Sequence, residues 1–179
     1  MSIALLIIDV QQRLCTGEFA AFDVGRVIDR INAVSSKARA SGALVVVIQH
    51  ETEGGDMDHG TDAWKLSPAL ETASGDVFLR KKATDSFHQT DLHAVLKARG
   101  VTRLVICGLQ SEFCVDTTTR RALALGYPVV LVSDGHSTLD NGVLSAAQIA
   151  AHHNVTLSNI ESFGPRAVPI AASEVRFEV

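Results

Sequence analysis

The sequence predicts an α/β protein in three layers (α-β-α), with a mostly parallel six-stranded sheet between two layers of helices. Short continuous apolar runs alternate along the chain with segments whose apolar residues recur every three or four positions. Such runs fit strands buried on both faces, and their alternation with helices is typical of a parallel sheet. The 179 residues, 46% of them hydrophobic, suit one domain with a sizeable core. We therefore expect a Rossmann-like fold in which residues 1–179 form a single domain.

Each element is justified by its pattern and its boundaries. The expected strands are apolar runs bounded by polar residues, glycine or proline, over residues 3–8, 43–48, 77–79, 103–107, 128–132 and 155–157. The expected helices show apolar residues at three- and four-residue steps, over residues 24–38, 90–99, 112–125 and 143–152. Asp23 and Thr90 are candidate N-caps, and Gly42, Gly100 and Gly126 are candidate C-terminal stops.

Two segments have no clear periodicity. Residues 49–70 contain several Gly and Asp residues and are expected to form a long loop, with at most one short helix. Long loops in compact domains are often functional. The C-terminal residues 164–179 are dense in apolar side chains, namely Val168, Ile170, Val175, Phe177 and Val179. These side chains are expected to be covered, either by their own domain or by a partner subunit.

Composition excludes several classes of function. The net charge is −4, and the chain has no basic tract, so nucleic-acid or anionic-membrane binding has no support. No apolar run approaches the roughly 20 residues that span a bilayer, and the N-terminus lacks the pattern of a signal peptide. Three cysteines without framework spacing favour free thiols in a reducing cytoplasm.

Chemically capable side chains fall where the expected strands end. Ligands of parallel α/β sheets bind beyond the carboxyl ends of the strands, so these groups are expected to share one rim. They are Asp9, His50, Lys81, Lys82, residues 110–114, Asp134 and His136.

Cys114 is the candidate nucleophile of this rim. The usual thiol pKa is about 8.5, and a helix N-terminus or a nearby cation lowers it. Cys114 has both an expected helix start and a lysine from the third strand, while Asp9 can accept the thiol proton. These parts suit acyl transfer through a thioester. The alternative is a buried structural cysteine, which is common, and we assign Cys107 to the core on that ground.

Four stretches, in this order, carry a resemblance to a known family. They are "LLIIDVQ", "KKATDSFHQTDL", "LVICGLQSEFCVDTTTRRALALGYPVVLVSD" and "LSAAQIAAHHNVTL". The chain resembles the isochorismatase-like cysteine hydrolases, which include nicotinamidases and related amidases, over roughly residues 3–160. The resemblance implies a catalytic triad of Asp9, a lysine of the 81/82 pair, and Cys114. The family pattern places the lysine six residues before an aromatic residue, which gives Lys81 when counted back from Phe87, and strand alternation allows only one of the two lysines to face Cys114.

The resemblance implies further features of the site and the assembly. A cis peptide is expected between Leu109 and Gln110, and the backbone N–H groups of Gln110 and Cys114 are expected to form an oxyanion hole. A homo-oligomer, dimeric or larger, is expected as well. The candidates for the substrate pocket are His50, Trp64, Phe87, Phe113 and His136.

Other readings of the site stay open. The nicotinamidase branch uses a metal, and His50, Asp56, Asp58 and His59 are conceivable ligands, but their spacing departs from that branch. We therefore expect no metal and no cofactor. True isochorismatases cleave a vinyl ether, a redox-sensing thiol protein would need Cys15 as a resolving partner, and a binding module would lack a competent triad. The preferred hypothesis is hydrolysis of an amide or carbamoyl C–N bond in a small molecule.

Overall fold

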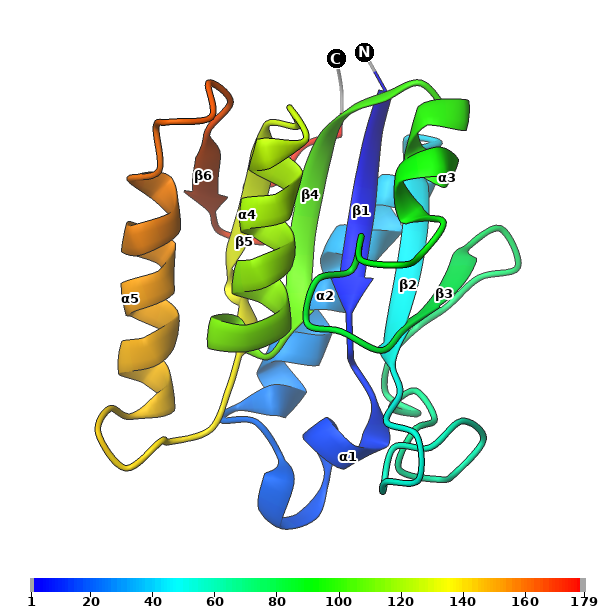
Figure 1. Ribbon diagram of the computed structural model, residues 1–179, viewed down its shortest axis with the longest axis vertical. Coiled ribbons are helices and arrows are strands. Elements are labelled where there is room, and N and C mark those ends of the chain that lie inside the picture. The colour runs from blue at the N-terminus through cyan, green and yellow to red at the C-terminus, as the bar shows by residue number, and fades with distance from the viewer. Residues whose placement is uncertain (1, 178–179) are drawn as a thin grey trace.

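The structure, a computed structural model, describes residues 2–177 and contains one parallel sheet (Figure 1). Its six strands lie in the order β3-β2-β1-β4-β5-β6, and every neighbouring pair is parallel. The strands are β1 (Ser2–Ile8), β2 (Leu44–His50), β3 (Val77–Lys81), β4 (Val101–Leu109), β5 (Val129–Ser137) and β6 (Ala167–Ile170). This is the doubly wound order of a Rossmann-like fold, so the predicted fold class is confirmed.

Helices cover both faces of the sheet, which makes three layers. In Figure 1, α3, α4 and α5 lie in front of the sheet and α2 lies behind it. The helical segments are α1 (Gln12–Cys15), η1 (Gly17–Phe19), α2 (Val24–Ala40), α3 (Leu92–Ala98), η2 (Ser111–Val115), α4 (Asp116–Ala124) and α5 (Ala146–Ser158). In residues 2–177, no helix is long and apolar enough to cross a bilayer.

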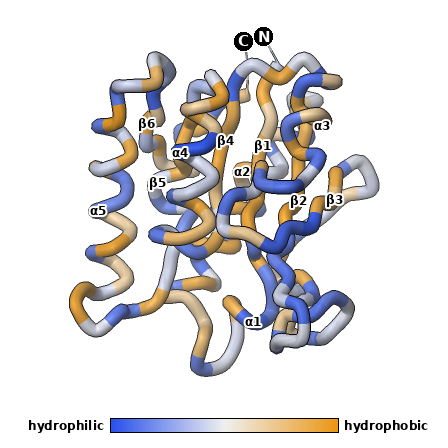
Figure 2. Tube along the Cα trace, in the orientation of Figure 1, coloured by the Kyte–Doolittle hydropathy of each residue, from blue (hydrophilic) through white to orange (hydrophobic). Residues whose placement is uncertain are grey.

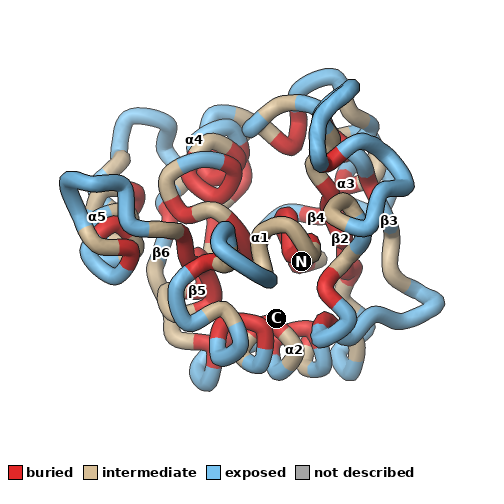
Figure 3. The backbone as a smooth tube through the Cα atoms, turned by 90° about the horizontal axis from the view of Figure 1, so that it is seen from below, coloured by how far each residue is buried: buried red, intermediate tan, exposed pale blue. Residues whose placement is uncertain are grey.

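Alternation along the central strands divides the core into two clusters. On β1, Ala4, Leu6 and Ile8 pack towards α3 and α4, whereas Leu5 and Ile7 pack towards α2. Figure 2 shows these central strands as mostly hydrophobic, and Figure 3 shows the buried segments inside a periphery of exposed loops. Burial on both faces explains why the strands appear in the sequence as continuous apolar runs.

The sixth strand was predicted in the wrong place. Residues 155–157 belong to α5, and the sixth strand is β6 at residues 167–170. The helix is fixed at its start by a capping box between Ser145 and Gln148, and its apolar period continues from Ile149 to Leu157, both buried. Val155 is 62% exposed, as expected of a helical residue between two buried positions. A short apolar triplet alone does not distinguish a strand from the last turn of a helix.

The C-terminal segment packs on its own domain. Val175 and Phe177 are buried in the cluster beneath α2, and Lys37 donates hydrogen bonds to the backbone carbonyls of Ala172 and Ser173 at 3.0 and 2.9 Å. Val179 lies outside the described residues. Val168, by contrast, is 49% exposed on β6. The structure therefore supports covering of Val175 and Phe177 by their own domain, whereas Val168 is not covered.

The point where the strand order reverses lies between β1 and β4. The two strands approach each other closely there, since a Cβ atom on Gly108 would lie 2.1 Å from the Ile8 carbonyl oxygen. Gly108 also has a φ of +121°, which L side chains rarely adopt. Ligands of doubly wound sheets bind beyond the carboxyl ends of the strands at such a reversal. The fold therefore places the ligand-binding region beyond Ile8 and Leu109.

Candidate active site

The ends of β1 and β3 and the turn after β4 bring Asp9, Lys81 and Cys114 together. The Lys81 Nζ lies 2.8 Å from Asp9 Oδ2 and 3.1 Å from Cys114 Sγ. It also lies 3.3 Å from His50 Nδ1, and it donates a hydrogen bond to the Ala83 carbonyl at 3.0 Å. One buried ammonium group therefore joins a carboxylate, a thiol, an imidazole and a backbone carbonyl that are far apart in the sequence.

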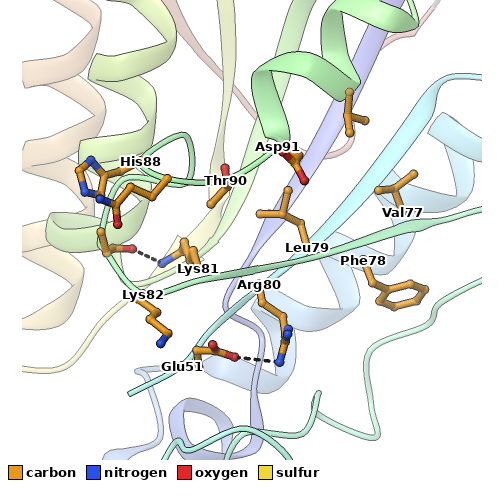
Figure 4. A pocket seen from close by; sticks show the side chains of 13 residues that line it. Glu51, Val77, Phe78, Leu79, Arg80, Lys81, Lys82, His88, Thr90 and Asp91 are labelled. Atoms are coloured by element: carbon orange, nitrogen blue, oxygen red, sulfur yellow. Dashed lines mark hydrogen bonds and ion pairs between the residues drawn. The ribbon is translucent and has the colours of Figure 1, made fainter. Parts of the chain in front are cut away.

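Neighbouring lysines at the end of β3 point to different environments. The Lys81 side chain is 0% exposed, whereas that of Lys82 is 63% exposed and pairs with Glu53 at 3.1 Å. Figure 4 shows the two side chains extending in different directions. This is the alternation expected of adjacent strand residues. Only Lys81 therefore faces Cys114.

Asp9 stands in an unusual backbone conformation where β1 ends. Its φ is +53°, in the left-handed region, and its N–H donates to the Ile48 carbonyl at 2.9 Å. Non-glycine residues in this region are uncommon and are often found at functional sites. While Oδ2 accepts from Lys81, Oδ1 is buried and finds no hydrogen-bond partner in the described part of the chain, residues 2–177. The carboxylate therefore keeps an acceptor oxygen for a proton from a neighbouring group.

Cys114 lies in a single π-helical turn, η2, rather than in the first turn of an α-helix. The predicted helix over residues 112–125 starts later, as α4 at Asp116. Within the turn, the N–H groups of Phe113 and Val115 both donate to the Gln110 carbonyl at 3.2 Å. The peptide between Leu109 and Gln110 is cis. Wide turns of this kind are frequent at functional sites, and no residue pattern predicts them from sequence.

The expectation of a lowered thiol pKa is wrong. Burial and the neighbouring carboxylate of Asp9 raise the pKa of Cys114 to about 12, although Lys81 acts in the opposite direction. The physical reason is that one ammonium cannot neutralise two anions in one buried site. Asp9 already carries the negative charge that pairs with Lys81, so Cys114 keeps its proton.

The two basic groups of the cluster have distinct charge states. Burial lowers the pKa of Lys81, but Asp9 and Cys114 outweigh burial, so the pKa is raised and the amine stays charged. Burial and the Lys81 charge lower the pKa of His50. Because the ammonium donates to His50 Nδ1, the neutral imidazole carries its proton on Nε2. The cluster therefore contains one cation, one anion and two neutral groups at pH 7.

This charge arrangement predicts how Cys114 reacts with an alkylating agent. In the free protein, iodoacetamide should label Cys114 slowly at pH 7 and faster as the pH rises towards about 12. Asp9→Asn removes the carboxylate that raises the thiol pKa while Lys81 remains, so labelling at pH 8 should become at least about tenfold faster. Intact-protein and peptide mass spectrometry would measure both rates. An unchanged or slower rate in Asp9→Asn would contradict the conclusion that the Asp9 carboxylate raises the pKa of Cys114.

The five candidates for the substrate pocket do not share one position. His50 is half-buried beside Lys81, and Phe113 is 51% exposed on the nucleophile's turn. Trp64 is half-buried in the loop beside β1, where its ring packs against His59. Phe87 and His136 are more deeply buried than these three, and their contact with a substrate stays a prediction.

Phe87 and His136 are buried in the protein interior. Phe87 stacks with Tyr127 at a ring distance of 6.4 Å and belongs to the core beneath α3 and α4. His136 is 4% exposed, with Nδ1 2.8 Å from Ser111 Oγ and Nε2 3.1 Å from Asn154 Oδ1. Burial lowers the pKa of His136, so the neutral ring can donate to Asn154 and accept from Ser111. His136 therefore supports the turn that carries Cys114.

Two further polar residues that hold the site were not predicted. Gln11 is fully buried, and its amide exchanges hydrogen bonds with the His50 backbone at 2.8 and 2.9 Å and donates to the Trp64 carbonyl at 2.7 Å. Ser111, also fully buried, bonds His136. The only available signal for Gln11 was a long polar side chain two positions after Asp9. Its partners come from loops whose course the sequence does not reveal.

The conceivable metal ligands of the long loop are engaged elsewhere. Asp56 pairs with Arg13 at 3.0 Å, Asp58 accepts from the backbone N–H of His59, and His59 packs on Trp64. Across residues 2–177, the only cluster of three potential ligands is Asp9, His50 and Cys114, whose ligand atoms lie within 4.8 Å of one another. Lys81 Nζ contacts all three residues within 3.3 Å, so its charge lies where a bound cation would have to be. This donor set does not fit a metal ion while Lys81 is protonated.

Cys15 does not face the nucleophile. The three cysteines are free thiols, and Cys15 packs against the cluster on the α2 side of the sheet. Cys114 belongs to the cluster on the opposite side. Burial raises the pKa of Cys15 to about 11, and a hydrogen bond from Ser67 opposes this. A resolving cysteine would need an accessible, acidic thiol near Cys114, so the arrangement disfavours the redox-sensing alternative.

Two cavities flank the cluster on different sides. The larger, about 570 Å³, lies along the edge strand β3 and includes Glu51, Arg80, Lys82 and Asp91 (Figure 4). Lys81 also lines this cavity, and of its other charged side chains Glu51 and Arg80 form an ion pair at 3.4 Å, whereas Lys82 pairs with Glu53 outside the lining. A second cavity of about 420 Å³ is lined by Gln110, Glu112 and Phe113 of the nucleophile's turn, together with segments after β1, β2 and β5. Both cavities are candidates for a substrate site, since Lys81 lines the first, and the second is lined by Gln110, Glu112 and Phe113, which are neighbours of Cys114 in the chain.

Comparisons with known proteins agree with this geometry. The family model described as "Isochorismatase domain" matches residues 3–162. Streptothricin hydrolase of Streptomyces noursei is 42% identical over 138 residues, which cover 76% of this chain, and the chain spans about half (50%) of that relative's length. Ureidoacrylate amidohydrolase of Klebsiella pneumoniae is 27% identical, covering 97% of this chain and 92% of the relative.

A solved structure supports the same assignment. The crystal structure of an isochorismatase family protein superposes with a TM-score of 0.86 at 36% identity, covering 94% of this chain and 98% of that chain. The family match over residues 3–162 and the likeness of the whole fold to this solved structure agree with each other. The chain therefore belongs to the isochorismatase family.

Proposed function

We propose that the protein is a cysteine-dependent hydrolase that cleaves an amide or carbamoyl C–N bond of a small molecule through a thioester. The observation that carries the proposal is the buried Lys81 ammonium, which bridges the Asp9 carboxylate at 2.8 Å and the Cys114 thiol at 3.1 Å. A structural cysteine needs neither partner. The amidohydrolase among the relatives supports C–N chemistry.

In the first half of the proposed reaction, Cys114 is acylated. The thiol proton moves to Asp9 as Sγ attacks the carbonyl carbon, and a C–S bond forms. The backbone N–H groups of Gln110 and Cys114 are proposed to stabilise the oxyanion, and Lys81 stabilises the developing thiolate. Asp9 then returns the proton to the nitrogen as the C–N bond breaks. Ammonia or an amine leaves, and the thioester remains.

In the second half, water releases the acyl group. Asp9, ionised again, accepts a proton from the attacking water, and the C–S bond breaks as the tetrahedral intermediate collapses. The proton held by Asp9 returns to Sγ, which restores the starting state. Lys81 stays protonated throughout, in keeping with its raised pKa. The high pKa of Cys114 means that the thiolate forms only together with proton transfer to Asp9, so the resting thiol is protected from other electrophiles.

A substrate screen tests the proposed function. Primary amides, N-carbamoyl compounds and isochorismate would be incubated with the protein, and ammonia, carboxylate and pyruvate release would be measured. At least one compound is expected to release ammonia, together with a carboxylate if it is an amide, or with carbon dioxide and an amine if it is an N-carbamoyl compound. Cleavage of isochorismate alone, undiminished in Cys114→Ala, would contradict the proposal and favour vinyl ether hydrolysis without the thiol.

The reaction is expected to proceed without a metal ion. Because the Lys81 ammonium contacts all three groups of the only ligand cluster in residues 2–177, a bound divalent cation would have to displace it. Dialysis against a strong chelator should therefore leave the rate within about twofold of the untreated enzyme, and added zinc, iron or manganese should not raise it. A loss of activity on chelation that one of these ions restores would revive the metal-dependent alternative.

We further propose that the protein acts as a homo-oligomer in a reducing cytoplasm. Three free thiols suit that compartment. The aromatic side chain of Phe22 is exposed, lies outside the core and outside both cavities, and is available for a subunit contact. Light scattering during size exclusion should give a mass of at least twice 19.1 kDa at micromolar concentration. A mass near 19.1 kDa would exclude the oligomer.

A further inference from the structure

The second cavity contains a carboxylate whose hydrogen-bonding capacity the protein uses only in part. Glu112 Oε1 accepts a hydrogen bond from Thr138 Oγ1 at 2.9 Å. Glu112 Oε2 is buried and has no hydrogen-bond partner among residues 2–177. Among the residues that line this cavity, Glu112 is the only one with a buried side-chain polar atom left unpaired. A buried acceptor without a donor is costly, so a ligand that supplies an N–H group would be favoured there.

The other charged and polar groups of the cavity do not neutralise Glu112. Arg13, the one cation of the lining, pairs with Asp56 at 3.0 Å and stacks on the Phe19 ring at 3.4 Å. The carboxylate of Asp140, also in the lining, accepts from the backbone N–H of Ala146 and adds a second negative charge. The cavity therefore has an excess of negative charge beside an unpaired carboxylate oxygen.

The shape of the cavity suits a cation with an apolar stem. Phe113 lines it at 51% exposure and presents aromatic surface next to Glu112 in the chain, whereas the Phe19 ring, also in the lining, already stacks with the Arg13 guanidinium. Aromatic faces attract ammonium and guanidinium groups, and a charged N–H donor forms a stronger hydrogen bond with a carboxylate than a neutral one does. A volume of about 420 Å³ is ample for a small molecule that extends away from the scissile carbonyl.

From these observations we infer that Glu112 selects substrates that carry an ammonium or guanidinium group remote from the scissile amide. Glu112 precedes Cys114 by two residues in the same turn, η2, so one rigid element presents the nucleophile and the carboxylate together. The Thr138 hydrogen bond holds the carboxylate in place, while Oε2 remains for the ligand. This inference rests on the proposed amide hydrolysis and adds its substrate class.

A pair of isosteric amides tests the inference. 5-Aminopentanamide carries a terminal ammonium where hexanamide carries a methyl group, and both would be assayed for ammonia release at low ionic strength. In the wild type, kcat/KM should be at least about tenfold higher for 5-aminopentanamide than for hexanamide, because its ammonium group can form one charge-assisted hydrogen bond with Glu112. In Glu112→Gln, this preference should fall below about twofold. Glu18→Gln, which removes the same charge from an exposed position near Phe19, should keep it.

Binding distinguishes a failure of this inference from a failure of the proposed function. Titration calorimetry with Cys114→Ala, and with Cys114→Ala/Glu112→Gln, measures affinity for both amides without turnover. If Cys114→Ala binds 5-aminopentanamide more tightly than hexanamide, and Glu112→Gln removes the difference, the inference is supported. If the wild type hydrolyses neither amide, that result counts against the proposed function and leaves the inference supported. Equal affinities in Cys114→Ala, or a preference that survives Glu112→Gln, would overturn it. Circular dichroism confirms that each variant is folded.

Discussion

Cys114→Ala is expected to lower the hydrolytic rate by roughly 10⁴-fold or more, since removing the nucleophile of a covalent mechanism leaves only binding and electrostatic stabilisation. Cys114→Ser should be nearly as inactive, because Asp9 would have to accept a proton from a hydroxyl far less acidic than a thiol. The side chain is small and lies at the edge of the core, so the fold should persist. Rates would be measured on the best amide of the screen.

The matched control for this variant is Cys15→Ala. Cys15 is a free thiol on the other side of the sheet, and its loss should leave the rate within about twofold of the wild type. Circular dichroism and thermal unfolding would show that both variants retain the native structure. Activity near the wild-type value in Cys114→Ala would contradict the thioester mechanism, whatever the activity of Cys15→Ala.

Lys81→Ala should lower the rate by about 10³-fold and also destabilise the fold. It removes the charge that supports the thiolate, and it leaves the fully buried Asp9 without its cation, for which a cost of about 3–5 kcal/mol is typical. Lys82→Ala removes the same side chain from a solvent-exposed ion pair with Glu53, which is worth about 1 kcal/mol or less. Its rate and its free energy of unfolding should change little.

The two lysine variants are informative as a pair. Rates would be measured at low temperature on protein shown to be folded, and urea unfolding would give the free energies. Because loss of rate in Lys81→Ala could follow from loss of structure, Lys81→Met in an Asp9→Asn background removes both charges and should fold better than Lys81→Ala while staying inactive. If Lys82→Ala proved inactive and Lys81→Ala active, the assignment of the lysine would be wrong.

Much of the fold was predictable because its strands are buried on both faces. The apolar runs that became β1, β2 and β4 are continuous in the sequence, and the helices between them carry clear periodicity. The sixth strand was wrongly predicted at residues 155–157 because the true sixth strand is not buried on both faces. An edge strand such as β6 is short and partly exposed, so its sequence signal is weaker than that of the helical turn mistaken for it.

The members of the site were predictable, but their electrostatics were not. Asp9 and Cys114 stand at strand ends, and alternation together with the family pattern selects Lys81 over Lys82. The pKa of Cys114 is raised because the thiol is buried and lies near the Asp9 carboxylate. Both causes depend on the tertiary structure. The π-turn of η2 and the supporting contacts of Gln11 and His136 join segments distant in sequence, so no local pattern predicts them.

Rapid-quench mass spectrometry of the enzyme during turnover tests the central claim most directly. When the best amide substrate is mixed with the protein and the reaction is stopped in acid within milliseconds, a fraction of the chain should carry the mass of the acyl group, and peptide mapping should place that group on Cys114. The adduct should form and decay within the time course of ammonia release and should be absent from Cys114→Ala. Turnover without any adduct on Cys114, combined with undiminished hydrolysis by Cys114→Ala, would contradict the thioester account.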